Sequence, residues 1–325
     1  MQAIVVDDTS PDRTLHWQQV DDPGPGPGEV LVDIHATAVN RADLLQRQGQ
    51  YPPPPGAPPY MGLEMAGTVA ALGAGVGGWR IGERVCALLA GGGYAERVAV
   101  PAALLTRLPD DWDFVRAAGF PEVFYTAYVN LFVEAGLQAG ETVLIHGGAS
   151  GVGTAAIQLA KARGCRVAVT ASTAQKLDAC RRLGADILIN YQETDFAQAL
   201  LKECDGADVV LDIAAAPYLE RHLELLKTCG RLVCIALLGG SRAEVDLGLM
   251  LRKRLRLIGS VLRSRPLAEK TAIVDGFRRR FWPLLAAGEI SPVIDTVLPV
   301  DRAAEAQAIL QQNRNTGKVI LQVRD

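Results

Sequence analysis

The stretch that decides the fold is VLIHGGASGVGTAAIQLAKARG, from Val143 to Gly164. An apolar run typical of a buried strand leads into a glycine-rich turn, and the turn opens a helix. Backbone N–H groups and the N-terminus of such a helix attract a pyrophosphate, because unpaired donors and partial positive charge favour an anion. The segment therefore predicts a dinucleotide-binding turn, with a tight turn that serves packing alone as the alternative. Its candidate cofactor contacts are Gly148, Ser150, Gly151, Val152 and Gly153.

Ser150 departs from the dinucleotide pattern G-x-G-x-x-G, because it stands at the slot where the backbone approaches phosphate most closely. Its hydroxyl is a candidate donor to phosphate or to the nicotinamide side. An NAD site carries Asp or Glu about 20 residues further on, for the ribose 2′-hydroxyl. Here no acid lies between Cys165 and Gln175, and Ser172 and Lys176 take that place. An ammonium attracts a 2′-phosphate, so this region favours NADPH, unless Lys176 is only a solvated helix charge.

Around this turn, strand-like runs alternate with amphipathic helices from about residue 122 to residue 261. Such alternation predicts a doubly wound parallel sheet of the Rossmann type. Residues before 122 are β-rich and punctuated by Gly and Pro clusters, and the closing strand at 317–323 is expected to return to them. A long helix is expected near 266–287. The fold class is thus α/β, with a β-rich domain at 1–121 and 288–325 and a Rossmann NADPH-binding domain at 122–287.

Composition fits a globular protein of two domains: 325 residues, 49% apolar, 21% charged, with a net charge of −3. This slightly negative net charge does not favour binding to nucleic acid or to an anionic membrane surface. No apolar run approaches the roughly 20 residues that span a bilayer. The first residues lack the flank and apolar core of a secretory signal, so a cytoplasmic location is expected. The six cysteines form no C-x-x-C pair and are expected to be small buried hydrophobic residues.

Several separated motifs resemble the medium-chain dehydrogenase/reductase superfamily. GLEMAGTVAALGAGVGGWRIGERV (62–85) resembles its signature. AVNRADLLQRQGQYPPPPG (38–56), the turn GGASGVG and SVLRSR (260–265) resemble the zinc-free quinone oxidoreductases, most closely the tumour-suppressor-inducible group, with zeta-crystallin more distant. The resemblance implies a GroES-like N-terminal domain, a Rossmann domain, an active-site cleft between them and a homodimer. It also implies hydride transfer from NADPH to a quinone or to the β-carbon of an enone.

The same resemblance assigns further site residues. Asn40 and Asp43 would lie beside nicotinamide or ribose, and Thr126 would touch the nicotinamide. Tyr51 would face the substrate and either donate a proton or stack on a ring. Tyr191 would join Ser172 and Lys176 at the 2′-phosphate. The late cofactor contacts would be Leu262, Arg263, Asn315, Gly317 and Lys318. The predicted catalytic residues are Tyr51, Asn40 and Ser150. The alternatives are that Asn40 caps a helix and that Tyr51 packs on prolines.

Departures from the zinc alcohol dehydrogenases predict that no metal is bound. Asn40 stands where those enzymes place a cysteine ligand, and Leu63 stands where their signature places histidine. Glu64 remains, and without a metal it is expected to be a satisfied buried carboxylate. The four closely spaced cysteines of a structural zinc lobe are absent.

Three functions remain open on the sequence. The leading one is an NADPH-dependent quinone oxidoreductase, followed by a reductase of enones or enoyl thioesters. The third is a non-catalytic, cofactor-responsive RNA-binding or structural protein, for which the basic run LRKRLRL (251–257) and the arginines at 278–280 are the candidate features. No aromatic residues interleave that run, which is more typical of a solvated face, so no nucleic-acid partner is expected.

Overall fold

The chain divides into two units, and the computed structural model describes residues 1–324. Unit 1 comprises Met1–Val123, Arg263–Arg279 and the C-terminal segment from Ser291. Unit 2 comprises Phe124–Leu262 and Arg280–Ile290. Unit 1 is therefore discontinuous, like the predicted β-rich domain.

The segment Arg263–Arg279 belongs to unit 1, whereas the sequence placed it in the Rossmann domain. Two contacts explain the difference. The Phe277 ring lies 5.4 Å from the Phe120 ring, and Arg278 donates a hydrogen bond of 3.1 Å to the backbone oxygen of Leu105.

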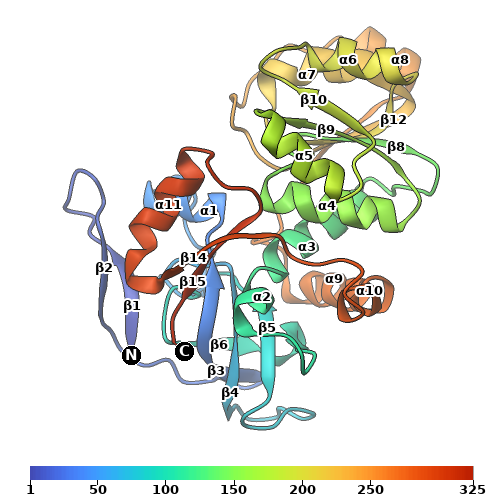
Figure 1. Cartoon of the computed structure of the whole chain (residues 1–325). Helices are drawn as coiled ribbons and strands as arrows, with labels where there is room; N and C mark the ends of the chain where they lie inside the picture. The colour runs from blue at the N-terminus through green and yellow to red at the C-terminus, as the bar shows by residue number, and fades with distance from the viewer. Residues whose placement is uncertain (325) are drawn as a thin grey trace. The chain divides into compact units, whose positions relative to one another are not determined.

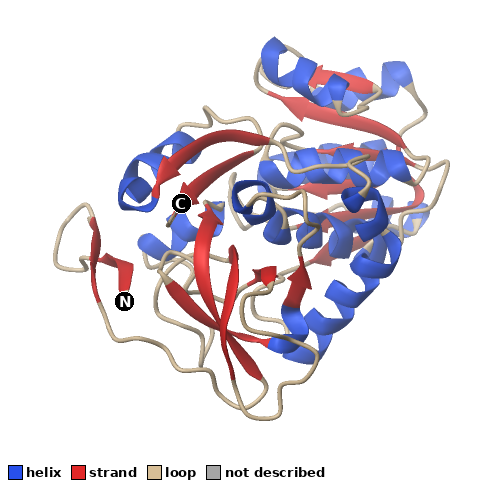
Figure 2. Cartoon of the chain, turned by 60° about the horizontal axis from the view of Figure 1, so that its bottom comes forward, coloured by secondary structure: helices blue, strands red, loops and turns tan. Residues whose placement is uncertain are grey.

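Unit 2 is built on a six-stranded parallel sheet in the order β10-β9-β8-β11-β12-β13 (Figures 1 and 2). This is the doubly wound order, in which the chain reverses direction beside its first strand. The strands are β8 (Thr142–Ile145), β9 (Arg166–Ala171), β10 (Ile187–Asn190), β11 (Ala207–Asp212), β12 (Leu226–Cys234) and β13 (Arg256–Gly259). All residues of β8 are buried, as expected of a strand covered on both faces.

Helices cover both faces of this sheet (Figure 1). They are the π-helix η2 (Val129–Glu134), α4 (Gly151–Ala162), α5 (Ala174–Arg182), α6 (Phe196–Glu203), the short η3 (Ala216–Tyr218), α7 (Leu219–Leu225) and α8 (Leu247–Lys253). Buried side chains of α6 and α7, such as Phe196 and Leu223, pack on Leu144 and Val210 of the sheet. These contacts form part of the core of unit 2.

Unit 1 is built on a seven-stranded sheet in the order β14-β15-β3-β4-β5-β7, with β6 also paired to β3, beside a two-stranded hairpin of β1 and β2. The hairpin strands are β1 (Gln2–Val6) and β2 (Leu15–Gln19). The sheet strands are β3 (Glu29–Ala38), β4 (Glu64–Leu72), β5 (Arg84–Leu88), β6 (Arg97–Pro101), β7 (Leu105–Arg107), β14 (Ile294–Pro299) and β15 (Lys318–Gln322). In β15, Ile320 pairs with Ala38 of β3, so the last strand returns to the N-terminal sheet as predicted.

The helices of unit 1 are α1 (Arg41–Arg47), η1 (Ala102–Leu104), α2 (Phe114–Ala118), η4 (Val300–Arg302) and α11 (Ala303–Gln311), while α3 (Pro121–Tyr128) and α9 (Leu267–Arg280) cross the unit boundary. The predicted single helix at 266–287 is wrong. It is interrupted at Phe281, and α10 (Trp282–Ala286) follows. Pro283 explains the interruption, because proline lacks an N–H and its ring clashes with the preceding turn.

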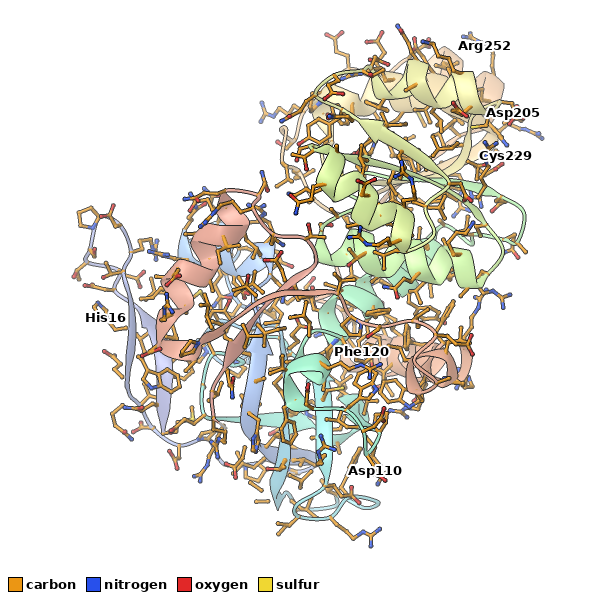
Figure 3. The ribbon with its side chains drawn as sticks, in the orientation of Figure 1. His16, Asp110, Phe120, Asp205, Cys229 and Arg252 are labelled. Carbon is orange, nitrogen blue, oxygen red and sulfur yellow. The ribbon has the colours of Figure 1, made fainter. Side chains whose placement is uncertain are left out.

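Three of the six cysteines, Cys86, Cys165 and Cys180, are buried, whereas Cys204 and Cys234 are only partly so. Cys229 is exposed and lies at the periphery of unit 2 (Figure 3), so the expectation of burial is wrong there. Its backbone has φ +65°, a left-handed conformation found in turns and irregular strands. No helix in the described part of the chain is long and apolar enough to cross a bilayer.

Candidate functional site

The glycine turn joins β8 to α4 at the carboxyl edge of the parallel sheet. A Cβ on Gly153 would lie 2.2 Å from the backbone oxygen of Gly147, and a Cβ on Gly148 would lie 2.7 Å from the Cβ of Val169. No side chain fits at either place, so the start of α4 lies directly against the loop. The first N–H groups of α4 have no partner within the helix. This cradle has the shape and the donors that suit a pyrophosphate.

Ser150 is the N-cap of α4. Its Oγ accepts a hydrogen bond of 3.0 Å from the Gly153 N–H, and Gly151 and Val152 follow as the first two helical residues. The hydroxyl proton of Ser150 is not used in this bond, so it remains a candidate donor to a phosphate. Ser150 therefore has a structural role as well, which the sequence did not indicate.

The predicted 2′-phosphate residues gather at the carboxyl ends of β9 and β10. Asn190 pairs with Ala171 across these strands, and Tyr191 and Ser172 are the next residues on each. Thr173 caps α5 by accepting a hydrogen bond from the Lys176 N–H at 3.3 Å, which places Lys176 in the first turn. Tyr191 is exposed. The topology thus brings together the three residues predicted to select NADPH.

Thr126 and Leu262 complete the predicted residues of unit 2. The Oγ1 of Thr126 is buried and forms no hydrogen bond within the described residues. Buried hydroxyls are usually satisfied, so this group suits a ligand that would complete it. Leu262 is buried just before the chain enters unit 1.

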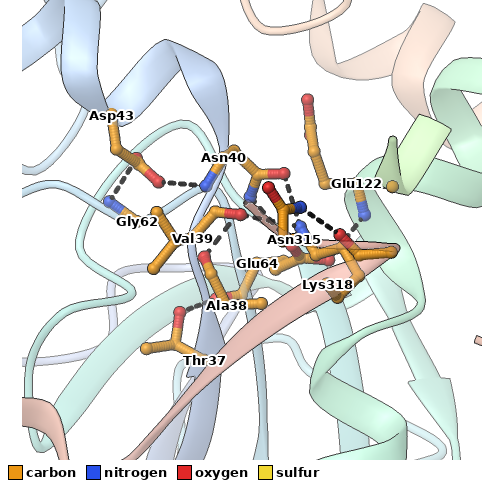
Figure 4. A network of polar contacts seen from close by, with 12 residues as sticks. Thr37, Ala38, Val39, Asn40, Asp43, Gly62, Glu64, Glu122, Asn315 and Lys318 are labelled. Atoms are coloured by element: carbon orange, nitrogen blue, oxygen red, sulfur yellow. Dashed lines mark hydrogen bonds and ion pairs between the residues drawn. The ribbon is translucent and has the colours of Figure 1, made fainter. Parts of the chain in front are cut away.

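In unit 1, a buried polar cluster joins Asn40, Glu64 and Lys318 (Figure 4). The Lys318 ammonium lies 2.8 Å from the Glu64 carboxylate and donates to the Asn40 side-chain oxygen at 2.6 Å. The Asn40 amide donates to the same carboxylate at 2.8 Å. The backbone N–H of Glu122 donates to the other carboxylate oxygen of Glu64 at 2.9 Å. Glu64 is thus a satisfied buried carboxylate, as predicted.

Asp43 connects this cluster to the start of α1. Its carboxylate accepts hydrogen bonds from the backbone N–H groups of Asn40 and Gly62 and from the Tyr94 hydroxyl, at 2.8, 3.1 and 3.0 Å. Burial raises the pKa of Asp43 to about 6 against the effect of these bonds. Asn40 does begin a helix, but its side chain points to Glu64 and Lys318. Both residues hold the loop before α1 in place, and their contact with a cofactor stays a prediction.

The predicted C-terminal residues lie at or just before the start of β15, whose first residue, Lys318, belongs to the same cluster. Asn315 donates to the backbone oxygen of Gly317 at 2.7 Å, and Gly317 has φ +82°. A Cβ at Gly317 would lie 2.2 Å from the backbone oxygen of Val293. Glycine is therefore required in the turn that delivers Lys318 to Asn40.

Tyr51 and Arg263 lie together although they are far apart in the sequence. The Arg263 guanidinium stands 5.2 Å from the centre of the Tyr51 ring and donates to the Tyr51 backbone oxygen at 3.3 Å. It also donates to Ala90 O at 2.7 Å and to the Gln46 side chain at 2.8 Å. Burial raises the pKa of Tyr51. Tyr51 is thus held by a cation–π contact in addition to its proline neighbours.

Sequence reasoning missed Glu122, which is partly buried beside this cluster. Burial and then the neighbouring Glu64 raise its pKa to about 8. The available signal was a single acid in the apolar run GFPEVFY at 119–125.

A second missed feature is a buried imidazole pair in unit 2. Nε2 of His146 and Nε2 of His222 lie 2.8 Å apart, and Nδ1 of His146 lies 3.0 Å from the Thr170 hydroxyl. Burial lowers the pKa of both rings, that of His222 to about 3, so both are neutral at pH 7. Asp212 Oδ2 lies 3.9 Å from Nδ1 of His222, beyond hydrogen-bond distance.

Neither cluster fits a zinc ion. In unit 1, Asn40 and Leu63 are not zinc ligands, and the Lys318 ammonium already neutralises Glu64. In unit 2, His146, Asp212 and His222 form the one His/Cys/Asp/Glu group close enough to suggest a metal among residues 1–324. The 2.8 Å between the imidazole nitrogens is a hydrogen-bond distance. Two nitrogens on tetrahedral zinc lie about 3.3 Å apart, given bonds of about 2.0 Å.

Comparisons with known proteins agree with this architecture. Residues 26–110 match the alcohol dehydrogenase GroES-like domain family, and residues 151–275 match the zinc-binding dehydrogenase family. A quinone oxidoreductase of Sus scrofa is 32% identical over 310 residues, which cover 92% of this chain and 90% of that protein.

Two solved structures show the same fold over the whole chain. The Escherichia coli quinone oxidoreductase complexed with NADPH is 27% identical, with a TM-score of 0.88 and 99% of each chain covered. The CurK enoyl reductase is 26% identical, with a TM-score of 0.86, covering 99% of this chain and 98% of that one. The two matched domain families, the sheet order and these relatives together show that the chain belongs to the medium-chain dehydrogenase/reductase superfamily and is an oxidoreductase.

Proposed function

We propose that this protein is an NADPH-dependent quinone oxidoreductase that works without a metal. The observation that carries the proposal is the buried Lys318–Glu64 ion pair of 2.8 Å, held by Asn40. Zinc dehydrogenases polarise an alcohol or carbonyl oxygen with a Lewis acid. In this cluster the ammonium of Lys318 and the amide of Asn40 donate to Glu64 and to neighbouring oxygens, and these residues form no zinc site, so the acceptor must already be electrophilic. A quinone meets that requirement.

The preference for NADPH rests on the carboxyl ends of β9 and β10. Ser172 and Tyr191 are neighbours there, and Lys176 lies in the first turn of α5. A hydroxyl, a phenol and an ammonium can each donate to a 2′-phosphate, and no carboxylate stands at the place where NAD-specific sites bind the 2′-hydroxyl. The relative from Escherichia coli, which was solved with NADPH, supports this choice.

When bound, the nicotinamide cofactor supplies the hydride, and the protein contributes binding, orientation and exclusion of water. The cradle at Gly148 and Gly153 would hold the pyrophosphate. The buried hydroxyl of Thr126 would bond to the nicotinamide side of the cofactor, and contact of Asn40 with the ribose stays a prediction of the family resemblance. Tyr51, held by Arg263, would stack on the acceptor ring.

A panel of acceptors tests the proposal. Purified protein is mixed with NADPH or NADH and with a small quinone, an enone, an enoyl thioester or an alcohol, in the presence and absence of a chelator. The expected result is reduction of the quinone with NADPH, unaffected by the chelator. Activity that requires zinc, or a clear preference for NADH, would contradict the proposal.

A reductase of enones or enoyl thioesters is the second candidate, because the fold is shared with the CurK enoyl reductase. It would use the same cofactor site and would pass hydride to the β-carbon of the acceptor. The acceptor panel distinguishes the two by comparing kcat/KM for the quinone with that for the enone and the thioester.

An RNA-binding role has less support. Within the basic run, Lys253 donates hydrogen bonds to the backbone oxygens of Leu223, Glu224 and Leu226. Its ammonium therefore closes the end of α7 and is engaged within the protein. Binding of labelled RNA at physiological salt, included beside the acceptor panel, tests this alternative directly.

A further inference from the structure

Glu122 occupies an unusual position at the start of α3. Its backbone N–H donates to the Glu64 carboxylate at 2.9 Å, which fixes its main chain to the Asn40–Glu64–Lys318 cluster. Its side chain points away from that cluster (Figure 4). No hydrogen bond to the Glu122 carboxyl forms within the described residues, although the side chain is partly buried. A glutamate whose backbone is fixed by a hydrogen bond, and whose carboxyl oxygens have no hydrogen-bond partner among the described residues, is suited to act on a ligand.

The surroundings of Glu122 come from four separate segments of unit 1. Glu64 and Asp43 oppose its ionisation, whereas Lys318 and Arg263 favour it. Burial is the largest effect, and together these influences raise its pKa to about 8. The carboxyl is therefore protonated at pH 7.

Two further titratable side chains lie within electrostatic range of Glu122. Its charge raises the pKa of Tyr51, and it counteracts the lowering of the Lys270 pKa by burial. Tyr51 is the residue predicted to face the substrate, so a substrate at Tyr51 would lie within the electrostatic range of this carboxyl.

We propose that Glu122 is the proton donor to the acceptor, an inference that rests on the proposed function. It is supported by the open carboxyl beside Tyr51 and Arg263 and by the anchoring of its backbone on Glu64. Neither the sequence pattern nor any feature of the glycine turn assigns this role.

The reaction balances with the groups named. NADPH transfers a hydride, which carries two electrons and one proton, to the quinone and becomes NADP⁺. The resulting hydroquinone monoanion takes the proton from the Glu122 O–H, and that O–H bond breaks to leave the carboxylate. Water then returns a proton to Glu122. An enone is treated in the same way, with the hydride on the β-carbon and the proton on the enolate.

Glu122 is a better acid for this step than Tyr51. A phenol has a pKa of about 10, close to that of the hydroquinone it would protonate, so the transfer gains little. Burial raises the pKa of Tyr51 further. A donor with a pKa near the working pH is the efficient choice for general acid catalysis.

The first experiment needs no cofactor and no substrate. Difference infrared spectroscopy follows the C=O stretch of protonated carboxyls in the whole protein between pH 7 and pH 9.5. A band that disappears with a midpoint near 8 is expected in the wild type and in Glu305→Gln, an exposed control on α11. The band should be missing in Glu122→Gln. A wild type without this band would overturn the inference.

The second experiment measures kcat/KM against pH for a quinone and an enone. The wild-type value should fall above pH 8, tenfold per pH unit. Glu122→Gln should be about 100-fold slower at pH 7 and should lose this dependence, because removal of a general acid costs 10²–10⁴-fold. Glu122→Asp should keep the dependence at a lower rate, and Tyr51→Phe should keep it as well. Melting curves show whether each variant is folded.

The outcomes separate this inference from the function on which it rests. If the wild type reduces no acceptor, both fail. If the wild type reduces quinones while folded Glu122→Gln keeps the wild-type rate and pH dependence, only the role of Glu122 is refuted.

Discussion

Replacing Lys318 by Met tests whether the buried cluster of unit 1 depends on its ammonium. Lys318 is 3% exposed and Glu64 is 0% exposed, so neither charge is screened by water. Without the cation, the Glu64 carboxylate keeps only the Asn40 amide and the Glu122 N–H as donors. Breaking a buried pair by removing one partner costs about 3–5 kcal/mol, because a buried charge is left uncompensated.

For a unit of this size, each kcal/mol shifts the melting temperature by about 2–4 °C, so Lys318→Met should lower it by roughly 10 °C. Calorimetry and urea unfolding, followed by the fluorescence of buried Trp112, measure the change. The matched control is Arg302→Met, which breaks the exposed pair with Glu305 and should cost about 0–1 kcal/mol.

A second substitution separates charge from packing. Glu64→Gln in the Lys318→Met background removes the uncompensated charge while keeping the shape of the side chain. It should recover at least about 2 kcal/mol, because the cost of the single variant is mainly electrostatic. If Lys318→Met lowers the free energy of unfolding no more than Arg302→Met does, the ion pair does not stabilise unit 1 as argued. The same conclusion follows if adding Glu64→Gln restores none of the lost free energy of unfolding.

Four other expectations follow from the geometry. Lys176→Ala should weaken NADPH binding about 10- to 100-fold in a fluorescence titration and leave NADH binding unchanged, since a hydrogen bond to a charged group is worth about 1.5–3 kcal/mol; equal weakening would make Lys176 structural. Gly153→Ala should abolish NADPH binding and lower the melting temperature, because its Cβ would lie 2.2 Å from a backbone oxygen; normal titration would contradict the cradle. Burial lowers the pKa of His222 to about 3, so unfolding should become easier below the unfolded pKa of about 6.5, by up to 1.4 kcal/mol per pH unit; His222→Phe should lose part of that slope in urea titrations at pH 7 and 5. The family resemblance predicts a homodimer; if its interface includes β13, which ends the sheet and exposes Leu257, light scattering should show monomers for Leu257→Lys, and a wild-type monomer would refute the dimer.

Unit 2 could be predicted closely because its signals are local. The glycine turn predicts a strand before it and a helix after it, and these are β8 at Thr142–Ile145 and α4 at Gly151–Ala162. Strand and helix periodicity change sharply at each turn residue there. The long helix at 266–287 was wrong because the apolar period continues through Pro283, while the backbone cannot. The hairpin of β1 and β2 and the π-helix η2 carry no strong pattern and were not predicted.

The candidate site divides in the same way. The glycine turn, Ser172 and Lys176 belong to a contiguous motif and were found from it. Glu122 and the pair of His146 and His222 were not found, because their significance comes from packing between segments far apart in the chain. The sequence predicted that the Glu64 carboxylate is buried and satisfied, but it did not predict the partner. That partner, Lys318, lies more than two hundred residues away in the chain.

The return of β15 to β3 has a consequence for synthesis of the protein. Ile320 pairs with Ala38, and Lys318 neutralises Glu64, so the N-terminal sheet is complete only once β15 has been made. At about 5–20 residues per second, a ribosome takes roughly 15–60 s to travel between these strands. During that interval the β3 edge is open and a carboxylate destined for burial has no cation. Unit 2, nearly continuous in the chain, can fold in the meantime, whereas unit 1 closes only after β15 has been made and depends on the edge of β3 staying unpaired until then.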